Sequence, residues 1–589
     1  MNWVKRVQTT IYGDEKKNST VYDLTKVDPN LLIPDRKLEK HFDYDDYENG
    51  DIYQNPPSKH AQEWETLETT NAEKMPYLMH IKSLSMGWPH LRYLAEWMEV
   101  TTSPTKWQLI RKLQDPELER VRRERARRTK IKAIDFVSGQ PVTNKNMHDI
   151  GSPDELSRHL EQPGVPGTTR LYIVEDLSRD VIERLGSKLD IDPLFFREHI
   201  NDYTWYNARD PWVELPDLDV VSRSRPYFRL MYMQPRYFTS RDSFDDARKQ
   251  AGFFNVLRRL DEDNEHESLF DDKSATIALV RSKTSFWIRP SNDTQSAIGV
   301  LLVDPSITEG FPLWKGYRPF KNSPAFSDKT PFQVPPRTSL FDDLIFWITQ
   351  TSQEDIDAIE HNPSAMSFRI LQIICAEWLT LSRYITSRLG QIEWEIEKPD
   401  LFQVKKPDLQ DSINFNTSLK KLHTWRRRLP IYKAMVADTQ ARIFPAHESG
   451  TDRKGCITDL KKDFQIVAGH FDDLLSRTER IATVATAVTA IEESRRAIEQ
   501  NKTLGRLTYL AVIFAPLSFV SSFFSMSTDL AGLTQTIWVY FCVAVPISFF
   551  VFLLVDKNWS NNMQGAYNKT KEAKHITAKL HIQQHHPKS

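Results

Sequence analysis

The sequence predicts an α+β cytoplasmic domain with a mostly antiparallel sheet and helices, then a long helical stalk, then two C-terminal transmembrane helices. Three observations predict this class. β-branched and aromatic runs separated by turn residues fill residues 168–306, and helical periodicity takes over from about 341. Two uncharged apolar runs of 18 and 19 residues stand near the C-terminus. A helix that crosses a bilayer needs about 20 such residues.

Composition and charge exclude several classes of protein. The 589 residues are 40% hydrophobic and 27% charged, with a formal net charge of -1, so no general affinity for nucleic acid is expected. The three cysteines form no CxxC pair, which argues against a disulfide framework or a zinc finger. The common nucleotide-binding, protease and hydrolase motifs are absent. We therefore expect neither an enzyme nor a cofactor.

Residues 1–167 are expected to form a polar N-terminal extension with few strands. The opening MNWVKRVQTTIYGDEKK has no apolar stretch of signal-peptide length, so membrane targeting is expected from the C-terminal runs. The segment PELERVRRERARRTKIK, which starts at Pro116, is basic and predicted to be helical. Two interpretations stay open, a solvated helix or a segment that contacts anionic lipid, and both are preferred to a nucleic-acid patch.

Residues 168–306 are expected to form the α/β domain. RLYIVEDL predicts a strand, and SRDVIERLGSKLDI after it predicts a helix with Ser178 as N-cap. DPLFFREHI predicts a second short helix with Pro193 near its start. The runs YFRLMYMQPRYF, ATIALVRS, SFWIRP and AIGVLLVDP predict four further strands.

A Pro-rich connection over 307–340 leads to a helical bundle and stalk over 341–506. Helices are predicted at 341–360, 363–397 and 408–444, followed by one long helix without proline from about 460 to 515. Apolar residues recur along this last helix at spacings of three, four and seven, which is typical of a coiled-coil seam. The seam residues are Phe464, Val467, Phe471, Leu474, Ile481 and Val488.

Residues 507–555 are expected to form a two-span transmembrane hairpin, and 556–589 a cytoplasmic tail. The runs 507–524 and 537–555 carry no charge, and Lys and Arg residues flank their outer ends. The connecting SMSTDLAGLTQT has Asp529 as its single charge, so the positive-inside rule places both termini in the cytoplasm. Two helices buried in a soluble core are the alternative.

The first run carries small residues at helical spacing, namely Ala511, Ala515, Ser518 and Ser522. Such a face allows two helices to pack closely. It is equally suited to line a water-filled path, which requires several copies of the hairpin around an axis.

The long helix, the segment FAPLSFVSSFFSM, a short loop and a second span near the C-terminus resemble the CorA family of divalent-cation transporters. The resemblance covers about 168–560. It implies a homopentamer with a funnel-shaped cytoplasmic domain, in which the first span lines the pore and a Gly-Met-Asn signature closes that span.

Alignment from Pro516 without gaps places this signature on Ser525, Met526 and Ser527, so only the methionine is kept. The resemblance implies that these residues and a ring of Asp529 carboxylates form the metal-binding pore mouth. It also implies that Leu504 and Leu507 form an apolar constriction and that Ser518 is a polar pore residue.

Two functions follow. The first is a homopentameric channel or transporter for Mg²⁺ or a related divalent cation. The second is a non-conducting, membrane-anchored interaction or sensor protein on the same scaffold, which the altered signature favours. In both, the partners are other copies of the chain and the bilayer, with no nucleic acid.

Overall fold

The computed structural model describes residues 75–85, 87–100, 124–125, 127–162, 168–201, 217–256, 258–263, 274–291, 296–327, 332–397, 410–444, 456–525 and 533–555. The chain divides into two compact units, Met1–Ile481 and Ala482–Ser589. The first unit holds a sheet with helices on both faces, and the second holds apolar helices.

The sheet of the first unit has eight strands among the described residues, in the order β2-β1-β3-β7-β6-β4-β8, with β5 also paired to β6. The β3–β7 pair is parallel and the other pairs are antiparallel, so the predicted mostly antiparallel α+β class is confirmed. The strands are β1 (Lys130–Val137), β2 (Met147–Ile150), β3 (Thr168–Glu175), β4 (Tyr227–Phe238), β5 (Arg259–Glu262), β6 (Thr276–Arg289), β7 (Ile298–Val303) and β8 (Phe311–Pro312).

One face of the sheet packs on helices from the N-terminal half of the unit. The helices of this half are α4 (Pro76–Ser85), α5 (Arg92–Val100), α7 (Pro153–Glu161), α8 (Arg179–Leu189), α9 (Pro193–Ile200), α10 (Asp219–Ser224) and α11 (Arg241–Phe253), with short 3-10 turns at Pro89–Leu91 and Asn144–Asn146. Tyr172 and Val174 of β3 share one apolar core with Val181 of α8 and Phe195 of α9. Buried apolar side chains thus hold the central strands between two layers.

The helices α8 and α9 begin close to where the sequence predicted. Ser178 is the N-cap residue of α8, although its side chain makes no capping hydrogen bond. Asp192 caps α9 by accepting a hydrogen bond from the backbone N–H of Leu194 at 2.9 Å, and Pro193 follows as the first helical residue.

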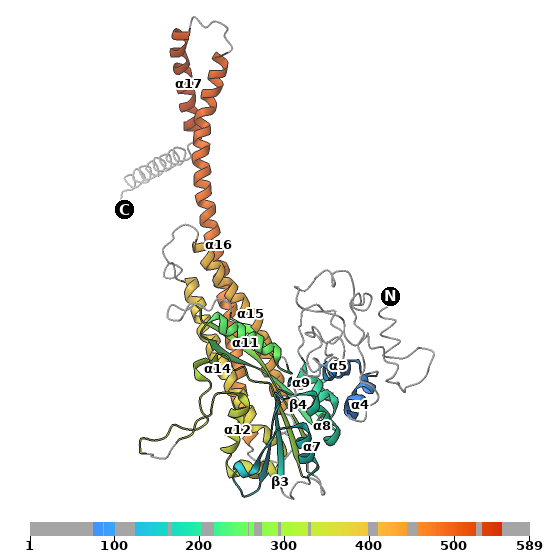
Figure 1. The fold of residues 1–589 in the computed structure, drawn as a ribbon. Coiled ribbons are helices and arrows are strands. Elements are labelled where there is room, and N and C mark those ends of the chain that lie inside the picture. Colours follow the sequence, from blue (N-terminus) through green and yellow to red (C-terminus); the bar gives the residue numbers. More distant parts are fainter. Residues whose placement is uncertain are drawn as a thin grey trace, which may run out of the picture. The chain divides into compact units, whose positions relative to one another are not determined.

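The other face of the sheet packs on helices from the second half of the unit (Figure 1). These are α12 (Leu340–Thr349), α13 (Gln353–His361), α14 (Phe368–Glu397), α15 (Gln410–Ile443) and the first part of α16 (Cys456–Phe524), with 3-10 turns at Leu313–Lys315 and Pro363–Ser367. Five of the six predicted seam residues of α16 are buried, and Phe471 packs edge-on against Trp378 of α14. The predicted long helix is therefore present.

A buried ion pair ties the sheet to α14. Asp263, directly after β5, accepts hydrogen bonds on Oδ2 from Arg388 Nε at 2.7 Å and from the Tyr384 hydroxyl at 2.5 Å. Both ionic side chains are 2% exposed. The neighbouring Glu262 carbonyl accepts a bond from Arg428 Nη2 of α15 at 2.8 Å. The end of β5 is thus fastened to two helices at once.

The structure differs from the sequence expectations in three respects. First, β1, β2, α4 and α5 lie in the stretch that was expected to be a polar extension, and they complete the sheet and its core. The carboxylate of Glu183 accepts hydrogen bonds from the first backbone N–H groups of α4, Tyr77 at 2.7 Å and Leu78 at 2.9 Å. This interaction fixes the start of α4 from a helix more than a hundred residues away in sequence.

The second difference is that the two strands expected at 275–282 and 285–290 form one strand, β6. The polar residues in the middle of β6 find hydrogen-bond partners inside the fold. Lys283 donates its backbone N–H to Asp304 and its Nζ to the carbonyl of Asn201. The third difference is that the helix expected at 341–360 is two helices. Ser352 caps α13 by accepting a bond from the N–H of Asp355, which ends the preceding helical run.

Most of the basic segment 116–132 lies outside the described residues. Lys130, Ile131 and Lys132 at its end belong to β1 rather than to a helix.

Candidate functional site

The predicted pore residues on α16 share one helical face in the second unit. Leu504, Leu507, Ala511, Ala515, Ser518 and Ser522 follow spacings of three and four residues, and all six are exposed in the single chain. Leu504 is 60% exposed and Leu507 is 66% exposed. Leucine side chains that are this exposed form an apolar surface that no other part of the single chain covers.

The opposite side of α16 packs on α17 (Leu533–Val555). Val520 and Ala544 are buried, and the Tyr540 hydroxyl donates to the carbonyl of Leu517 at 3.3 Å. Figure 1 shows α17 alongside the end of α16. The packing of α16 on α17 therefore leaves the face with the six predicted pore residues exposed.

Each of the two helices contains a proline, Pro516 in α16 and Pro546 in α17. Neither proline ends its helix. Each lacks the amide donor that would bond the carbonyl four residues earlier. A freed carbonyl inside an apolar helix needs a neighbour or water as its donor.

The pore mouth is described in part. Ser525 follows the last residue of α16, is exposed, and donates its backbone N–H to the carbonyl of Ser521 at 3.0 Å. Met526, Ser527 and Asp529 lie outside the described residues. Among the described residues, no three His, Cys, Asp or Glu side chains gather into a group that could hold a metal ion.

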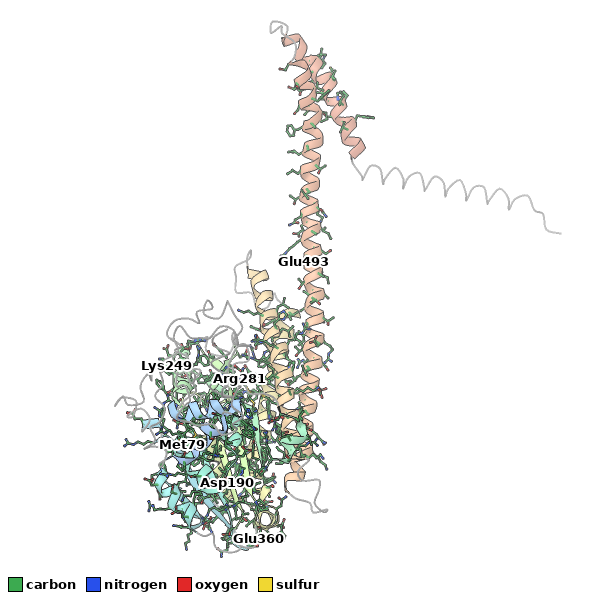
Figure 2. All side chains as sticks on the ribbon, turned by 90° about the vertical axis from the view of Figure 1, so that its right-hand side faces the viewer. Met79, Asp190, Lys249, Arg281, Glu360 and Glu493 are labelled. Carbon is green, nitrogen blue, oxygen red and sulfur yellow. The ribbon has the colours of Figure 1, made fainter. Side chains whose placement is uncertain are left out.

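Further apolar side chains are exposed on both helices of the second unit. They include Phe514 and Phe519 of α16 and Trp538, Phe541, Phe549 and Phe550 of α17, each more than half exposed. Counting only what the structure describes, no helix is long and apolar enough to cross a membrane. Between residues 493 and 502 of α16 many of the exposed side chains are charged, and Glu493 projects outward from the helix (Figure 2).

Sequence reasoning did not identify the buried polar groups of the first unit. His199, Arg258 and Asp304 lie against each other, with Arg258 Nε 3.5 Å and His199 Nε2 3.8 Å from the Asp304 carboxylate. Burial and the neighbouring Lys283, Arg229 and Arg258 hold the pKa of His199 well below its usual value, so it is neutral at pH 7. An acid directly after a buried apolar strand, as in VLLVDP, is the sequence signal for such a group.

One part of the chain matches a known protein family. Residues 343–557, from α12 through α17, match a family model described as CorA-like Mg²⁺ transporter protein. The family resemblance predicted from the sequence is thus confirmed over this part of the chain.

Two solved structures are similar to this chain at low identity. The complete structure of the CorA magnesium transporter from Methanocaldococcus jannaschii has 13% identity and a TM-score of 0.34, over 73% of this chain and 97% of that one. The structure of the full-length CmaX protein has 11% identity and a TM-score of 0.32, over 72% of this chain and 97% of that one. Both TM-scores are too low to establish a shared fold. No curated protein matches the sequence.

Proposed function

We propose that copies of this chain assemble as a homopentamer around α16 and pass Mg²⁺ or a related divalent cation through a central membrane pore. One observation carries the proposal: the stretch that matches the family model includes an exposed face of α16 that is lined by small, hydroxyl-bearing and leucine residues. One hairpin has too few helices to enclose a hydrated path. Several copies would cover the face and enclose the path together.

The proposal includes two membrane spans, 507–524 and 537–555. Both are uncharged, and the exposed Phe and Trp side chains of the second unit give them an apolar outer surface. Burying such groups in lipid removes them from water at a gain of about 25 cal/mol per Å². The bases outside both runs favour cytoplasmic termini.

The chemistry of the face suits a hydrated cation. Leu504 and Leu507 would form the apolar constriction, and Ser518 and Ser522 would offer hydroxyl oxygens further along α16. Hard divalent cations prefer oxygen ligands, and Mg²⁺ gives up its bound water reluctantly. At the mouth, Ser527 would contact the ion's water shell and five Asp529 carboxylates would attract cations.

The alternative is a membrane-anchored interaction or sensor protein that does not conduct. Ser525 and Ser527 favour it, since they replace the glycine and asparagine of the family signature.

Ion flux into liposomes decides between the two functions. We expect purified protein to admit Mg²⁺, with Co²⁺, Ni²⁺ and Zn²⁺ as comparison ions, and native mass measurement in detergent to give five copies. Leu507→Arg places five guanidinium groups at the proposed constriction and should abolish flux without changing the mass. Pentamers that pass none of the four ions would favour the non-conducting scaffold, and a stable monomer would remove the pore altogether.

The topology gives a second expectation. In a protein with Cys542→Ala, Thr534→Cys should be labelled by an impermeant thiol reagent from the side opposite the termini, because the loop carries no base. Lys502→Cys is the matched control and should be labelled only after permeabilisation. The reverse pattern would overturn the orientation.

A further inference from the structure

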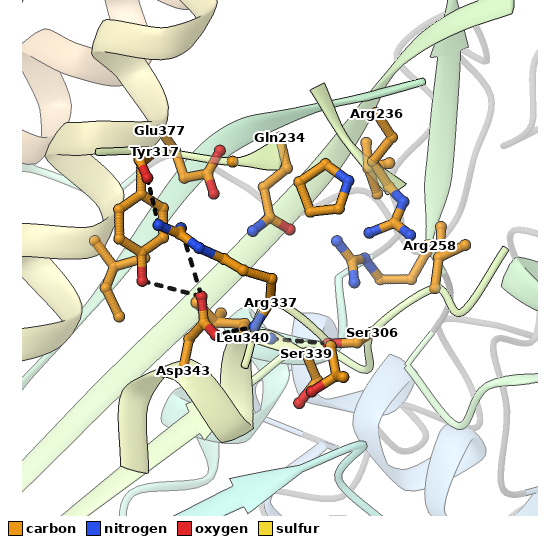
Figure 3. Close-up of a pocket in the computed structure, with 16 residues that line it drawn as sticks. Gln234, Arg236, Arg258, Ser306, Tyr317, Arg337, Ser339, Leu340, Asp343 and Glu377 are labelled. Carbon is orange, nitrogen blue, oxygen red and sulfur yellow. Dashed lines mark hydrogen bonds and ion pairs between the residues drawn. The ribbon is translucent and has the colours of Figure 1, made fainter. Parts of the chain in front are cut away.

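A cavity of about 40 Å³ lies inside the first unit, remote from the proposed pore residues in sequence. Figure 3 shows the segments that meet there: β4 with Gln234 and Arg236, the chain after β7 with Ser306, the start of α12 and Glu377 of α14. About 10–15 Å³ suffices for one water. The cavity therefore has room for a small polyatomic ligand.

Three arginines from three different segments line the cavity, namely Arg236, Arg258 and Arg337 (Figure 3). Arg258 is 4% exposed and is held by Ser282 Oγ at 2.7 Å, by the carbonyls of Pro305 and Arg281, and by the carboxylate of Asp304 at 3.5 Å. Its charge is thus paired with Asp304, and its position is fixed by neighbours on β6 and in the chain directly after β7.

Arg236 is fixed on one side only. Its Nε and Nη2 donate to the carbonyls of Glu309 and Gly310 at 2.8–3.3 Å. Within the part of the chain that is described, Nη1 has no hydrogen-bond partner, and a guanidinium offers two donors there. Burial and the nearby Arg258 lower the pKa of Arg236 to about 10, so the group is still charged at neutral pH.

Arg337 is held in a strained conformation. Its φ of 62° lies in the left-handed region, which is unfavourable for a residue other than glycine. Its backbone N–H donates to Asp343 at 2.8 Å, its Nη2 donates to the Tyr317 carbonyl, and its guanidinium lies 4.0 Å from the centre of the Tyr317 ring. These contacts fix the side chain against the cavity.

The Nη1 of Arg337 is buried and has no hydrogen-bond acceptor among the described residues, with Asp343 Oδ2 at 3.9 Å. Gly316, whose φ is 91°, leaves the space beside it, since a Cβ there would lie 2.9 Å from this atom. Two arginines therefore direct unused donors at one small cavity, and a buried donor without an acceptor is costly.

Two acids adjoin the cavity. Both carboxylate oxygens of Asp343 already accept a hydrogen bond, one from the backbone N–H of Arg337 and one from the Tyr317 hydroxyl. Burial and the nearby Asp343 raise the pKa of Glu377 to about 7, against the opposing effects of Arg337, Gln234 and Arg236. Protonation of Glu377 near neutral pH leaves Asp343 as the carboxylate that faces the charges of Arg236 and Arg337, while Arg258 is paired with Asp304.

We propose that this cavity binds a small oxyanion of the phosphate or sulfate type, which accepts hydrogen bonds from Arg236 and Arg337 beside Arg258. Charge-assisted bonds from guanidinium groups to such an anion are among the strong hydrogen bonds of proteins. The site is independent of ion conduction. The helix α14 that carries Glu377 also packs on α16 through Trp378 and Phe471, so the anion stabilises a junction of the first unit.

Sulfate binding to the full-length protein tests the site. We expect isothermal titration to give saturable sulfate binding, with chloride at matched ionic strength giving none. Arg236→Met should weaken sulfate binding roughly tenfold to a hundredfold, because it deletes charge-assisted bonds. Arg248→Met, which removes an exposed arginine of α11, is the matched control and should change nothing. Equal sulfate affinity in both variants, or no saturable binding in the unmodified protein, would overturn the proposal and leave a water-filled cavity.

A second variant keeps the test independent of folding defects. Sulfate does not change its protonation state between pH 6 and 8, so a change of sulfate affinity in this range reflects titration of a group in the protein. Affinity should fall several-fold as pH rises through the pKa of Glu377, because an ionised carboxylate repels the anion. Glu377→Gln should bind at least as tightly and without this pH dependence. The polar groups that face Glu377 from the packed elements are Asp343, Arg337, Gln234, Arg236 and Tyr232. A dependence that persists in Glu377→Gln would contradict the role of this acid.

The oxyanion can be free or part of a phosphomonoester. Inorganic phosphate and glycerol phosphate, titrated against the same protein, distinguish the two sources. Binding of inorganic phosphate alone identifies a free anion, and comparable binding of the ester shows that the cavity admits a phosphoryl group attached to a larger molecule. Either result supports the site, and binding of neither would contradict it.

Discussion

Replacement of Arg388 by methionine should destabilise the first unit by about 3–5 kcal/mol, the cost of leaving a buried charge without its partner. Arg388 donates to the Asp263 carboxylate inside the protein, where both side chains are 2% exposed. Methionine fills similar space but leaves Asp263 with the Tyr384 hydroxyl as its remaining side-chain donor among the bonds described. The carboxylate would then be buried with one neutral donor in place of a cation.

Urea unfolding followed by tryptophan fluorescence measures this effect, since Trp425 lies 6.0 Å from Tyr384 between ring centres. Arg383→Met on the same helix is the matched control, because Arg383 is exposed, and should stay within about 0.5 kcal/mol. The double variant Asp263→Asn with Arg388→Met removes both charges and should recover much of the loss. A single variant as stable as the Arg383→Met protein would show that the pair does not fasten α14 to the sheet.

The ion pair also shows why part of the fold could not be predicted from sequence. The strand β5 is four residues long, RLDE, and its polar character hides it from any pattern of alternating apolar residues. Its place in the sheet depends on pairing with β6 and on helices 120 to 170 residues away in sequence. In contrast, β4 matches the run YFRLMYMQPRYF residue for residue, because its aromatic and β-sheet-forming side chains carry a local signal.

The same contrast applies to the two sites. The face of α16 was predictable because helical spacing alone places Ala511, Ala515, Ser518 and Ser522 together. The oxyanion cavity was not, since Arg236, Arg258 and Arg337 come from segments that only the tertiary fold brings together. The roles of Ser525, Met526, Ser527 and Asp529 depend on the family resemblance, and they stay predictions.

Restoring the family signature should increase Mg²⁺ flux about tenfold if the chain forms the proposed pentameric pore. Ser525→Gly with Ser527→Asn recreates Gly-Met-Asn at the end of α16. The longer amide side chain offers an oxygen closer to the axis than a serine hydroxyl does, and glycine returns backbone freedom at the helix end. A gain of only ~0.3 kcal/mol per subunit, less than one net hydrogen bond, amounts to ~1.5 kcal/mol over five copies, or about tenfold in ion binding.

Ser527→Ala gives the opposite expectation, since it deletes the hydroxyl oxygen without blocking the path. Flux of Mg²⁺ into liposomes should fall, with protein mass unchanged. Ser548→Ala is the matched control, because it deletes a hydroxyl from α17, away from the pore face, and should leave flux as it is. If the unmodified protein passes no ion and the restored signature passes none either, residues beyond the signature close the path. The non-conducting, membrane-anchored scaffold would then replace the transporter as the proposed function.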